Sequence, residues 1–422
     1  MSTYRFFNAK IAQFNPEPSL IDGEVWIEND TILYAGPKKD TADLVFDTEK
    51  NCCGDLLLPG FKNAHAHTAM VFLRSHADDL PLEAWLTQQV FPYEELLTPE
   101  DSYTLVQLGI LEYVSSGITC ACEMYYHRDA IVQACLDTGF RMSLSCGGGT
   151  GKFAEEEYKK YSKIHPLITY HLGSHAPYTE SDENLHDIAE LCKQYREPFF
   201  IHLHETEKEI NDSLQLYGCR PLARLEKMGA FTYGGTGYHL VHCNDEDYSV
   251  LQRNRMFAVT CPSSNCKLAS GIAPVCKMME KGIPVAIGTD GAASNNSLDM
   301  FKEMFLVSAL QKVSYGIDVC PAKDVLKMAC STGADSMHLR DCNDLAAGKQ
   351  ADLILINLHE PNMQPINNIL SNLVYAGNKK NIRLTMIAGK VVYENGEYYT
   401  GTDPEEIYIK SNAIIRRMEQ SL

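Results

Sequence analysis

Eight short β-rich runs alternate with helix-like segments between residues 56 and 344, and this alternation constrains the fold more than any other feature. The runs span residues 56–67, 118–124, 140–146, 167–175, 198–205, 236–243, 257–262 and 284–290. The segments between them repeat apolar residues at helical spacing, as in residues 105–114. Eight strand–helix units predict an α/β fold, specifically a (β/α)8 TIM-like barrel.

The two ends of the chain show a different pattern. Residues 21–36 alternate apolar and polar side chains between turn residues, and residues 382–396 are typical of a hairpin. We therefore predict a small β-sandwich domain formed from both termini, residues 1–55 and 345–422, beside a barrel of residues 56–344. The 422 residues are enough for a barrel and an appended domain.

Composition limits the partners and the compartment. A net charge of −18 disfavours binding to nucleic acids, whose phosphates it repels. No apolar run reaches the roughly 18 residues that span a bilayer, and the first residues lack the apolar core of a signal peptide. The 15 cysteines are scattered without disulfide or zinc-finger spacing. We expect a cytoplasmic protein without nucleic-acid or membrane partners. The sequence leaves open whether the protein forms a homo-oligomer.

Polar side chains collect where the predicted strands end. His65 and His67 end the first run on one face of the strand, a pattern that suits zinc or another divalent metal. His175 ends the fourth run, and Asp290 ends the eighth. Because the carboxyl ends of barrel strands meet at one face, these groups are expected to converge into an active site.

The fifth and sixth runs each offer two histidines. His202 alternates with apolar neighbours, so we expect it to face the barrel interior as a metal ligand. His204 has the same parity but lies nearer the loop, and it is the weaker candidate. On the sixth run His239 and His242 lie on opposite strand faces, and we favour His239.

Two carboxylates complete the predicted chemistry. Glu205, at the mouth of the fifth strand, is a candidate general acid–base, although a carboxylate at a helix N-terminus is the simpler structural explanation. Asp290 is a candidate metal ligand and base rather than only a helix cap, because three imidazoles alone would provide no negatively charged proton acceptor.

With these motifs the chain resembles the amidohydrolase superfamily, in particular its mononuclear-metal aminohydrolases and the 5-methylthioadenosine/S-adenosylhomocysteine deaminases among them. The resemblance rests on the strand-end residues and on residues 58–70, 263–275, 288–296 and 348–353. No lysine ends the fourth strand, where dinuclear members carry a carbamylated one. The resemblance implies one divalent ion per chain, zinc or alternatively ferrous iron.

The resemblance also implies a role for each matching residue. The implied metal ligands are His65, His67, His202 and Asp290. The implied catalytic residues are Glu205 as proton shuttle, His239 as stabiliser of the tetrahedral oxygen, and Asp290 as base. The implied substrate contacts are Glu94 on ribose hydroxyls, His175, Glu205, Ser294 and Lys152. Lys152 stands in a segment where the family tends to have arginine for an amino-acid carboxylate, and lysine offers only a point charge there.

The implied function is hydrolytic deamination of an adenosine-type nucleoside (5'-methylthioadenosine, S-adenosylhomocysteine or adenosine) to the inosine analogue and ammonia. The partner is accordingly a small-molecule nucleoside. The alternatives are an aminohydrolase of guanine-like, pterin or triazine substrates, and a metal-binding scaffold without activity.

Overall fold

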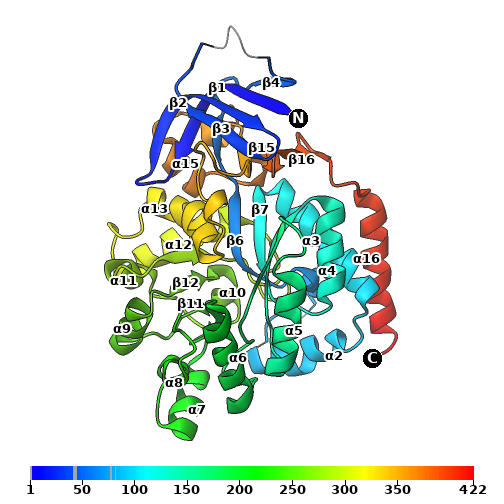
Figure 1. The fold of residues 1–422 in the computed structure, drawn as a ribbon, viewed down its shortest axis with the longest axis vertical. Coiled ribbons are helices and arrows are strands. Elements are labelled where there is room, and N and C mark those ends of the chain that lie inside the picture. Colours follow the sequence, from blue (N-terminus) through cyan, green and yellow to red (C-terminus); the bar gives the residue numbers. More distant parts are fainter. Residues whose placement is uncertain (1, 41–44, 77, 81) are drawn as a thin grey trace.

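The computed structural model describes the chain except for residues 1, 41–44, 77 and 81. A barrel forms the larger part of the molecule (Figure 1), and a smaller β domain containing the N-terminal strands caps one end of it. The C-terminal helix, drawn in red, runs along the side of the barrel.

Eight parallel strands form the wall of the barrel, as the alternation of strands and helices predicts. Their side chains are almost entirely buried, which is typical of parallel strands covered by helices. The strands are β6 (Phe61–Ala66), β7 (Ile118–Glu123), β8 (Arg141–Ser145), β9 (Ile168–His171), β10 (Phe199–Leu203), β11 (Gly235–His239), β12 (Phe257–Thr260) and β13 (Val285–Ile287).

The strands pair in two groups of four, β6 to β9 and β10 to β13. A parallel bridge between Gly173 and Phe200 joins the groups on one side. On the other side the Asp290 amide donates to the His65 carbonyl oxygen at 3.0 Å. The last strand is thereby tied to the first, and the residues that end them, His65 and Asp290, become neighbours.

The first predicted run is divided between the two parts of the molecule. Its first half forms β5 (Leu56–Pro59), which pairs with β1 and β14, and its second half forms β6 of the barrel. The break falls at Gly60, where a Cβ atom would lie 2.1 Å from the Thr119 side chain. A larger residue would clash with this β-branched side chain, so glycine fits at the point where the strand changes sheet.

The small domain uses strands from both termini, and they form one continuous hydrogen-bonded sheet. Apolar side chains from both halves of the sheet, such as Val25 and Leu355, share one core. Its strands are β1 (Thr3–Gln13), β2 (Ser19–Glu28), β3 (Thr31–Gly36), β4 (Thr48–Asn51), β5, β14 (Leu353–Ile356), β15 (Ile382–Ile387), β16 (Lys390–Glu394) and β17 (Glu397–Tyr398).

Helices cover the barrel, and α16 packs on α3 through the ion pair of Arg417 with Asp101 at 2.6 Å. The α-helices are α1 (Leu82–Ala84), α2 (Phe91–Glu94), α3 (Pro99–Ser115), α4 (Arg128–Thr138), α5 (Gly151–Tyr161), α6 (Asp182–Tyr195), α7 (Glu207–Tyr217), α8 (Pro221–Met228), α9 (Asp245–Arg253), α10 (Pro262–Lys267), α11 (Val275–Glu280), α12 (Met300–Tyr315), α13 (Ala322–Lys327), α14 (Gly333–Ser336), α15 (Ile369–Tyr375) and α16 (Pro404–Glu419). Shorter 3-10 or π turns are η1 (Thr68–Leu73), η2 (Trp85–Val90), η3 (Met328–Thr332), η4 (Arg340–Cys342), η5 (Pro361–Met363) and η6 (Lys379–Asn381).

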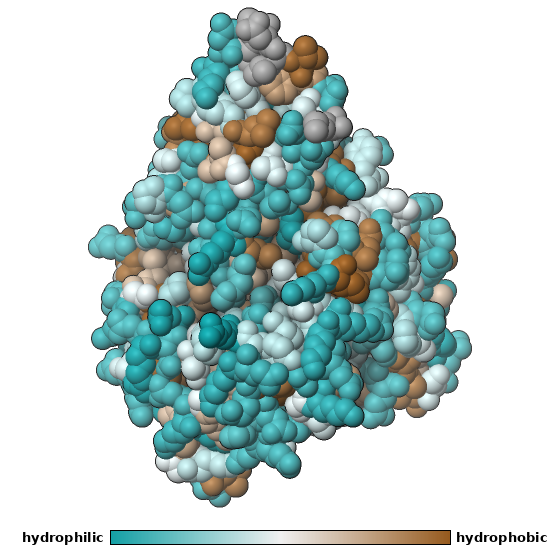
Figure 2. Space-filling model, viewed as in Figure 1, coloured by the Kyte–Doolittle hydropathy of each residue, from teal (hydrophilic) through white to brown (hydrophobic). Residues whose placement is uncertain are grey.

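The face shown in Figure 2 is mostly hydrophilic, with small separate apolar patches. Among the described residues no helix is both long enough and apolar enough to cross a bilayer. All 15 cysteines are free, and most are buried, as their spacing predicts.

A buried ion pair fastens the small domain to the barrel. Arg141 of β8 donates to both carboxylate oxygens of Asp352, through Nε at 2.7 Å and Nη2 at 3.0 Å. Asp352 also accepts the Ala388 amide at 2.8 Å. Burial alone would raise the pKa of Asp352, but Arg141 holds that pKa below its usual value.

We expect Asp352→Asn to lower the free energy of unfolding by about 3–5 kcal/mol, because it leaves the buried Arg141 charge without its counterion. Urea unfolding at pH 7 measures this loss. The matched control is Asp22→Asn, which removes an exposed carboxylate paired with Lys10 and should cost under ~1 kcal/mol. Because the pKa of Asp352 is lowered by folding, the difference should persist above pH 4 and narrow as the pH falls through that pKa. Equal losses in the two variants would contradict this assignment.

Candidate functional site

A pocket of about 1300 Å³ lies at the carboxyl ends of the barrel strands. This is the face at which TIM-barrel active sites form, because the strand-to-helix loops there converge. Of the residues named from the sequence, those that line it are His67, Glu94, His175, His202, Glu205, His239 and Asp290.

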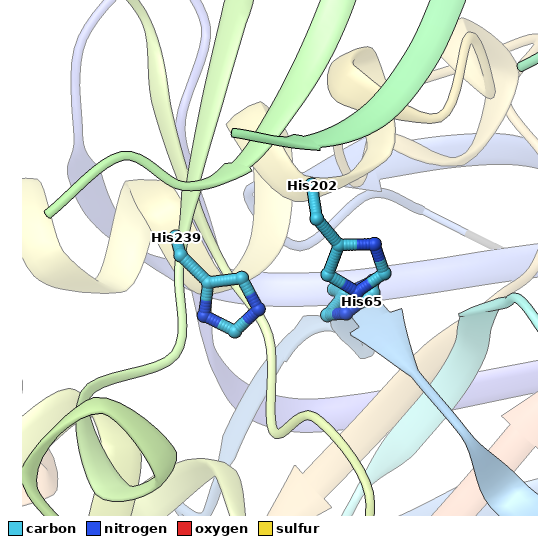
Figure 3. Close-up of side chains that lie close together, drawn as sticks. All are labelled: His65, His202 and His239. Atoms are coloured by element: carbon cyan, nitrogen blue, oxygen red, sulfur yellow. The ribbon is translucent and has the colours of Figure 1, made fainter. Parts of the chain in front are cut away.

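The strand-end histidines and Asp290 form a cluster of potential metal ligands. Asp290 Oδ1 lies 3.5 Å from His65 Nε2 and 3.2 Å from His67 Nε2. Tetrahedral ligands with metal bonds of roughly 2.0–2.1 Å stand about 3.3 Å apart, so this spacing matches one shared ion. Ring nitrogens of His65, His202 and His239 also lie within 4.8 Å of one another, and Figure 3 shows the three rings around one space.

The protein orients these rings through their other nitrogens. His67 Nδ1 contacts the Met124 carbonyl oxygen at 2.6 Å, and His202 Nδ1 contacts the His175 carbonyl oxygen at 2.6 Å. Each contact leaves Nε2 free toward the cluster, as in metal-ligating histidines. Neither ring nitrogen of His65 has a hydrogen-bond partner although both are buried, and burial lowers its pKa to about 3. A neutral, unpartnered imidazole fits a metal ligand.

Asp290 is held with one oxygen toward the cluster. Its Oδ2 accepts the hydroxyl groups of Ser264 at 2.6 Å and Ser294 at 2.8 Å, which leaves Oδ1 facing the imidazoles. Burial would raise the pKa of Asp290, but the neighbouring imidazoles of His65 and His67 hold that pKa well below its usual value. Asp290 is therefore an anion beside the histidines, as a metal ligand has to be.

His239 is also oriented through its other ring nitrogen. Its Nδ1 donates to Asn265 Oδ1 at 2.8 Å, so Nε2 faces the pocket. Burial alone would lower the pKa of His239, but the carboxylates of Glu205 and Asp290 raise it above its usual value. The backbone of His239 has a φ of 69°, a left-handed conformation that non-glycine residues seldom adopt.

Glu205 lies two residues after the end of β10, and its carboxylate is buried in the pocket wall. Burial raises the pKa of Glu205 above its usual value, which favours the protonated acid. Glu209 fixes the backbone around it by accepting the amides of His204 and Glu205, each at 2.9 Å. A carboxyl group with a raised pKa is thus held at a defined place beside the cluster.

A second carboxylate lies in the pocket apart from the cluster. Glu94 accepts the hydroxyl of Tyr125 at 2.6 Å, and burial raises the pKa of Glu94 above its usual value. His175 bonds to the Thr179 hydroxyl through Nδ1 at 3.1 Å, and its ring centre lies 4.7 Å from that of His202. The pocket therefore offers polar contacts on either side of the cluster.

The remaining candidates lie elsewhere. Lys152 has an 85% exposed side chain 3.9 Å from Glu156, and Ser294 bonds to Asp290; neither lines the pocket. His204 contacts Cys243 and Asp247 at 3.7 and 3.6 Å, and His242 bonds to the Ser270 carbonyl oxygen at 2.8 Å. Of the two histidines of the sixth run, His239 lines the pocket and His242 does not.

The sequence reasoning missed residues that support the site from behind. Tyr238 stacks on His65 with ring centres 3.9 Å apart. Asn265, Ser264 and Glu209 hold His239, Asp290 and the Glu205 backbone, as described above. Asn265 and Ser264 lie in the segment 263–275 that carries the family resemblance, but nothing in the sequence pattern alone indicates which partner each one holds.

Comparisons with known proteins agree with this architecture. Residues 56–392 match the model of the amidohydrolase family. The chain is 35% identical to the 5-methylthioadenosine/S-adenosylhomocysteine deaminase of Caldicellulosiruptor saccharolyticus over 98% of both chains, and 38% identical to that of Moorella thermoacetica over 96% of both. Its fold superposes with a TM-score of 0.92 on a zinc-bound adenosine deaminase from Xanthomonas campestris, which is 30% identical over 99% of this chain and 98% of that one.

The fold and the strand-end cluster are those of a metal-dependent barrel hydrolase. The chain belongs to the amidohydrolase family, and its relatives over nearly its full length carry the names of nucleoside deaminases.

Proposed function

We propose that the protein is a hydrolytic deaminase of adenosine-type nucleosides that uses one divalent ion, most simply Zn²⁺. The observation that carries this proposal is the presence of one pocket that contains both the ligand cluster with Glu205 and the separate carboxylate Glu94. When the purine ring binds near the cluster, its ribose extends toward Glu94, whose carboxylate can accept hydrogen bonds from the two sugar hydroxyls. The names of the relatives favour the same substrate class.

The proposed ligands are His65, His67, His202 and Asp290. When bound, the ion lowers the pKa of a water molecule toward neutrality and so supplies the nucleophile for hydrolysis. The histidines are suited to zinc and to ferrous iron alike, and metal analysis of the purified protein distinguishes the two ions.

The chain's own groups move the protons. Glu205, whose pKa is raised by burial, donates a proton to the ring nitrogen next to the amine-bearing carbon, C6 of adenine. Asp290, an anion, accepts a proton from the attacking water. His239 donates through Nε2 to the oxygen on which negative charge develops. The amine then takes the proton held by Asp290 and leaves as ammonia, while the proton of the new hydroxyl group returns to Glu205, so that both carboxyl groups regain their starting states.

An ammonia-release screen over methylthioadenosine, S-adenosylhomocysteine, adenosine, guanine, a pterin and a triazine tests this proposal. We expect turnover of adenosine-type nucleosides and a loss of kcat/KM for them of about 10–100-fold in Glu94→Ala, because that change removes the hydroxyl acceptor. Turnover confined to the guanine, pterin or triazine substrates would refute the proposal in favour of those activities. An absence of turnover with the metal bound would favour a scaffold without activity.

A further inference from the structure

The two substrates in the names of the relatives differ only in the group on the 5' sulfur, which is a neutral methyl group in one and an amino-acid tail with a carboxylate in the other. An enzyme that binds the second well needs a cation for that carboxylate. The charges on the pocket wall of this chain therefore bear on its choice of substrate.

Arg128 is the one arginine that lines the pocket among the described residues. It begins α4, three residues after Tyr125, whose hydroxyl binds Glu94. The segment from Tyr125 to Arg128 lines the pocket without a break. A tail that extends from a ribose at Glu94 along this wall meets Arg128 next.

Glu157 of α5 already neutralises this guanidinium. Arg128 Nη1 donates to Glu157 Oε1 at 2.9 Å, and the two side chains are only 10% and 11% exposed. The other oxygen of Glu157 accepts the Tyr170 hydroxyl at 2.8 Å, so the carboxylate is fixed from both sides. A pair with so little access to water is screened far less than a surface pair.

The other charges nearby do not replace Arg128. Lys160 is paired with Asp129 at 2.6 Å, and Asp129 is also bound by the Tyr161 hydroxyl at 2.8 Å. Lys152 lies outside the pocket. Away from the metal cluster and Glu94, the described charged residues on the wall are Glu95, Asp129, Glu156, Glu157, Glu180, Arg128 and Lys160. Five carboxylates face two cations, and each cation is paired.

We propose that the Arg128–Glu157 pair selects the 5' substituent: Glu157 neutralises the charge of the guanidinium, so the pocket favours nucleosides with an uncharged alkylthio group over those whose tail ends in a carboxylate. This rests on the proposed deaminase function. Glu157 is a specificity residue that acts through Arg128.

Substrate ratios test the proposal. The wild-type kcat/KM for methylthioadenosine should exceed that for S-adenosylhomocysteine by at least about tenfold, as expected for a carboxylate without a charged partner. Glu157→Gln keeps the side-chain shape but frees the guanidinium, so it should shift this ratio toward S-adenosylhomocysteine by about tenfold or more. Arg128→Gln placed on Glu157→Gln should abolish the shift.

Glu155→Gln is the matched control. Glu155 lies on the same helix and accepts the Tyr195 hydroxyl at 2.6 Å, as Glu157 accepts that of Tyr170, but it does not line the pocket. In the Glu155→Gln variant, the ratio of kcat/KM for methylthioadenosine to that for S-adenosylhomocysteine should stay at the wild-type value. Thermal unfolding and the kcat/KM for methylthioadenosine report whether each variant is folded.

The results that would refute the role of the Arg128–Glu157 pair differ from those that would refute the deaminase function. Equal or better turnover of S-adenosylhomocysteine in the wild type, or a folded Glu157→Gln variant with an unchanged ratio, would overturn the role of the pair but not the deaminase function. Absence of ammonia from every adenosine-type nucleoside would refute the deaminase function itself, and this inference with it.

Discussion

Glu205→Gln should reduce kcat for deamination by about 10²–10⁴-fold, the usual contribution of a positioned proton donor. Glutamine keeps the shape of the side chain but carries no transferable proton. Glu205 is buried in the pocket wall beside His239, and Glu209 fixes its backbone, so a water molecule is poorly placed to substitute for it. Steady-state ammonia release, measured with stoichiometric metal bound, gives the effect.

The pH profile separates loss of the proton donor from a general defect. Burial raises the pKa of Glu205, and the proposed role needs the protonated acid. The wild-type kcat should therefore fall as the pH rises through this pKa, and the variant should lack this dependence. Glu207→Gln, the same change two residues later at an exposed position, should retain wild-type kcat and profile. A metal-loaded Glu205→Gln variant with near wild-type turnover would refute the assignment.

The barrel could be predicted because its signal is local. Each predicted run overlaps an observed strand, since buried parallel strands are continuous apolar runs between amphipathic helices. The change of sheet at Gly60 could not be predicted in this way. It depends on the pairing of β5 with β1 and β14, and on Thr119, which lies 59 residues along the chain.

The meeting of the site residues at one place could also be predicted, because it follows from the topology of the barrel. Parallel strands bring their carboxyl ends to one face, so His65, His202 and Asp290 had to become neighbours once the barrel was assumed. Residues at the starts of the helices carry no such constraint. Lys152, in the first turn of α5, points to solvent, whereas Arg128, the first residue of α4, reaches the pocket wall, and no periodic pattern distinguishes the two.

Supporting contacts were the least predictable part. Asn265 holds His239 from 26 residues away, and Ser264 reaches Asp290 over the same separation. These pairs depend on side-chain directions at the ends of neighbouring strands. A single sequence records the residue types but not these directions.

Asp290→Asn should lower kcat by at least about 10³-fold and reduce metal content at the same time, because one carboxylate is proposed to serve as ligand and proton acceptor. The amide is isosteric, but it is neutral and a weaker ligand than the carboxylate. Its NH2 group, if turned toward Ser264 and Ser294, also replaces an acceptor of both hydroxyl groups. Elemental analysis and ammonia release on the same preparation measure the two losses.

Ser294→Ala tests how much the orientation of Asp290 contributes, because this change leaves the charge of Asp290 in place. It removes one of the two hydroxyl groups on Oδ2 and leaves Oδ1 facing His65 and His67. Loss of such a supporting contact typically costs 10–100-fold in metal affinity or activity, so the defect should be smaller than in Asp290→Asn and should be partly relieved by excess metal. Excess metal should not restore Asp290→Asn, because its missing proton acceptor is a separate defect. If metal alone restored full turnover to Asp290→Asn, Asp290 would be a ligand only. The proton of the attacking water would then have to go to another group of the pocket, such as Glu205.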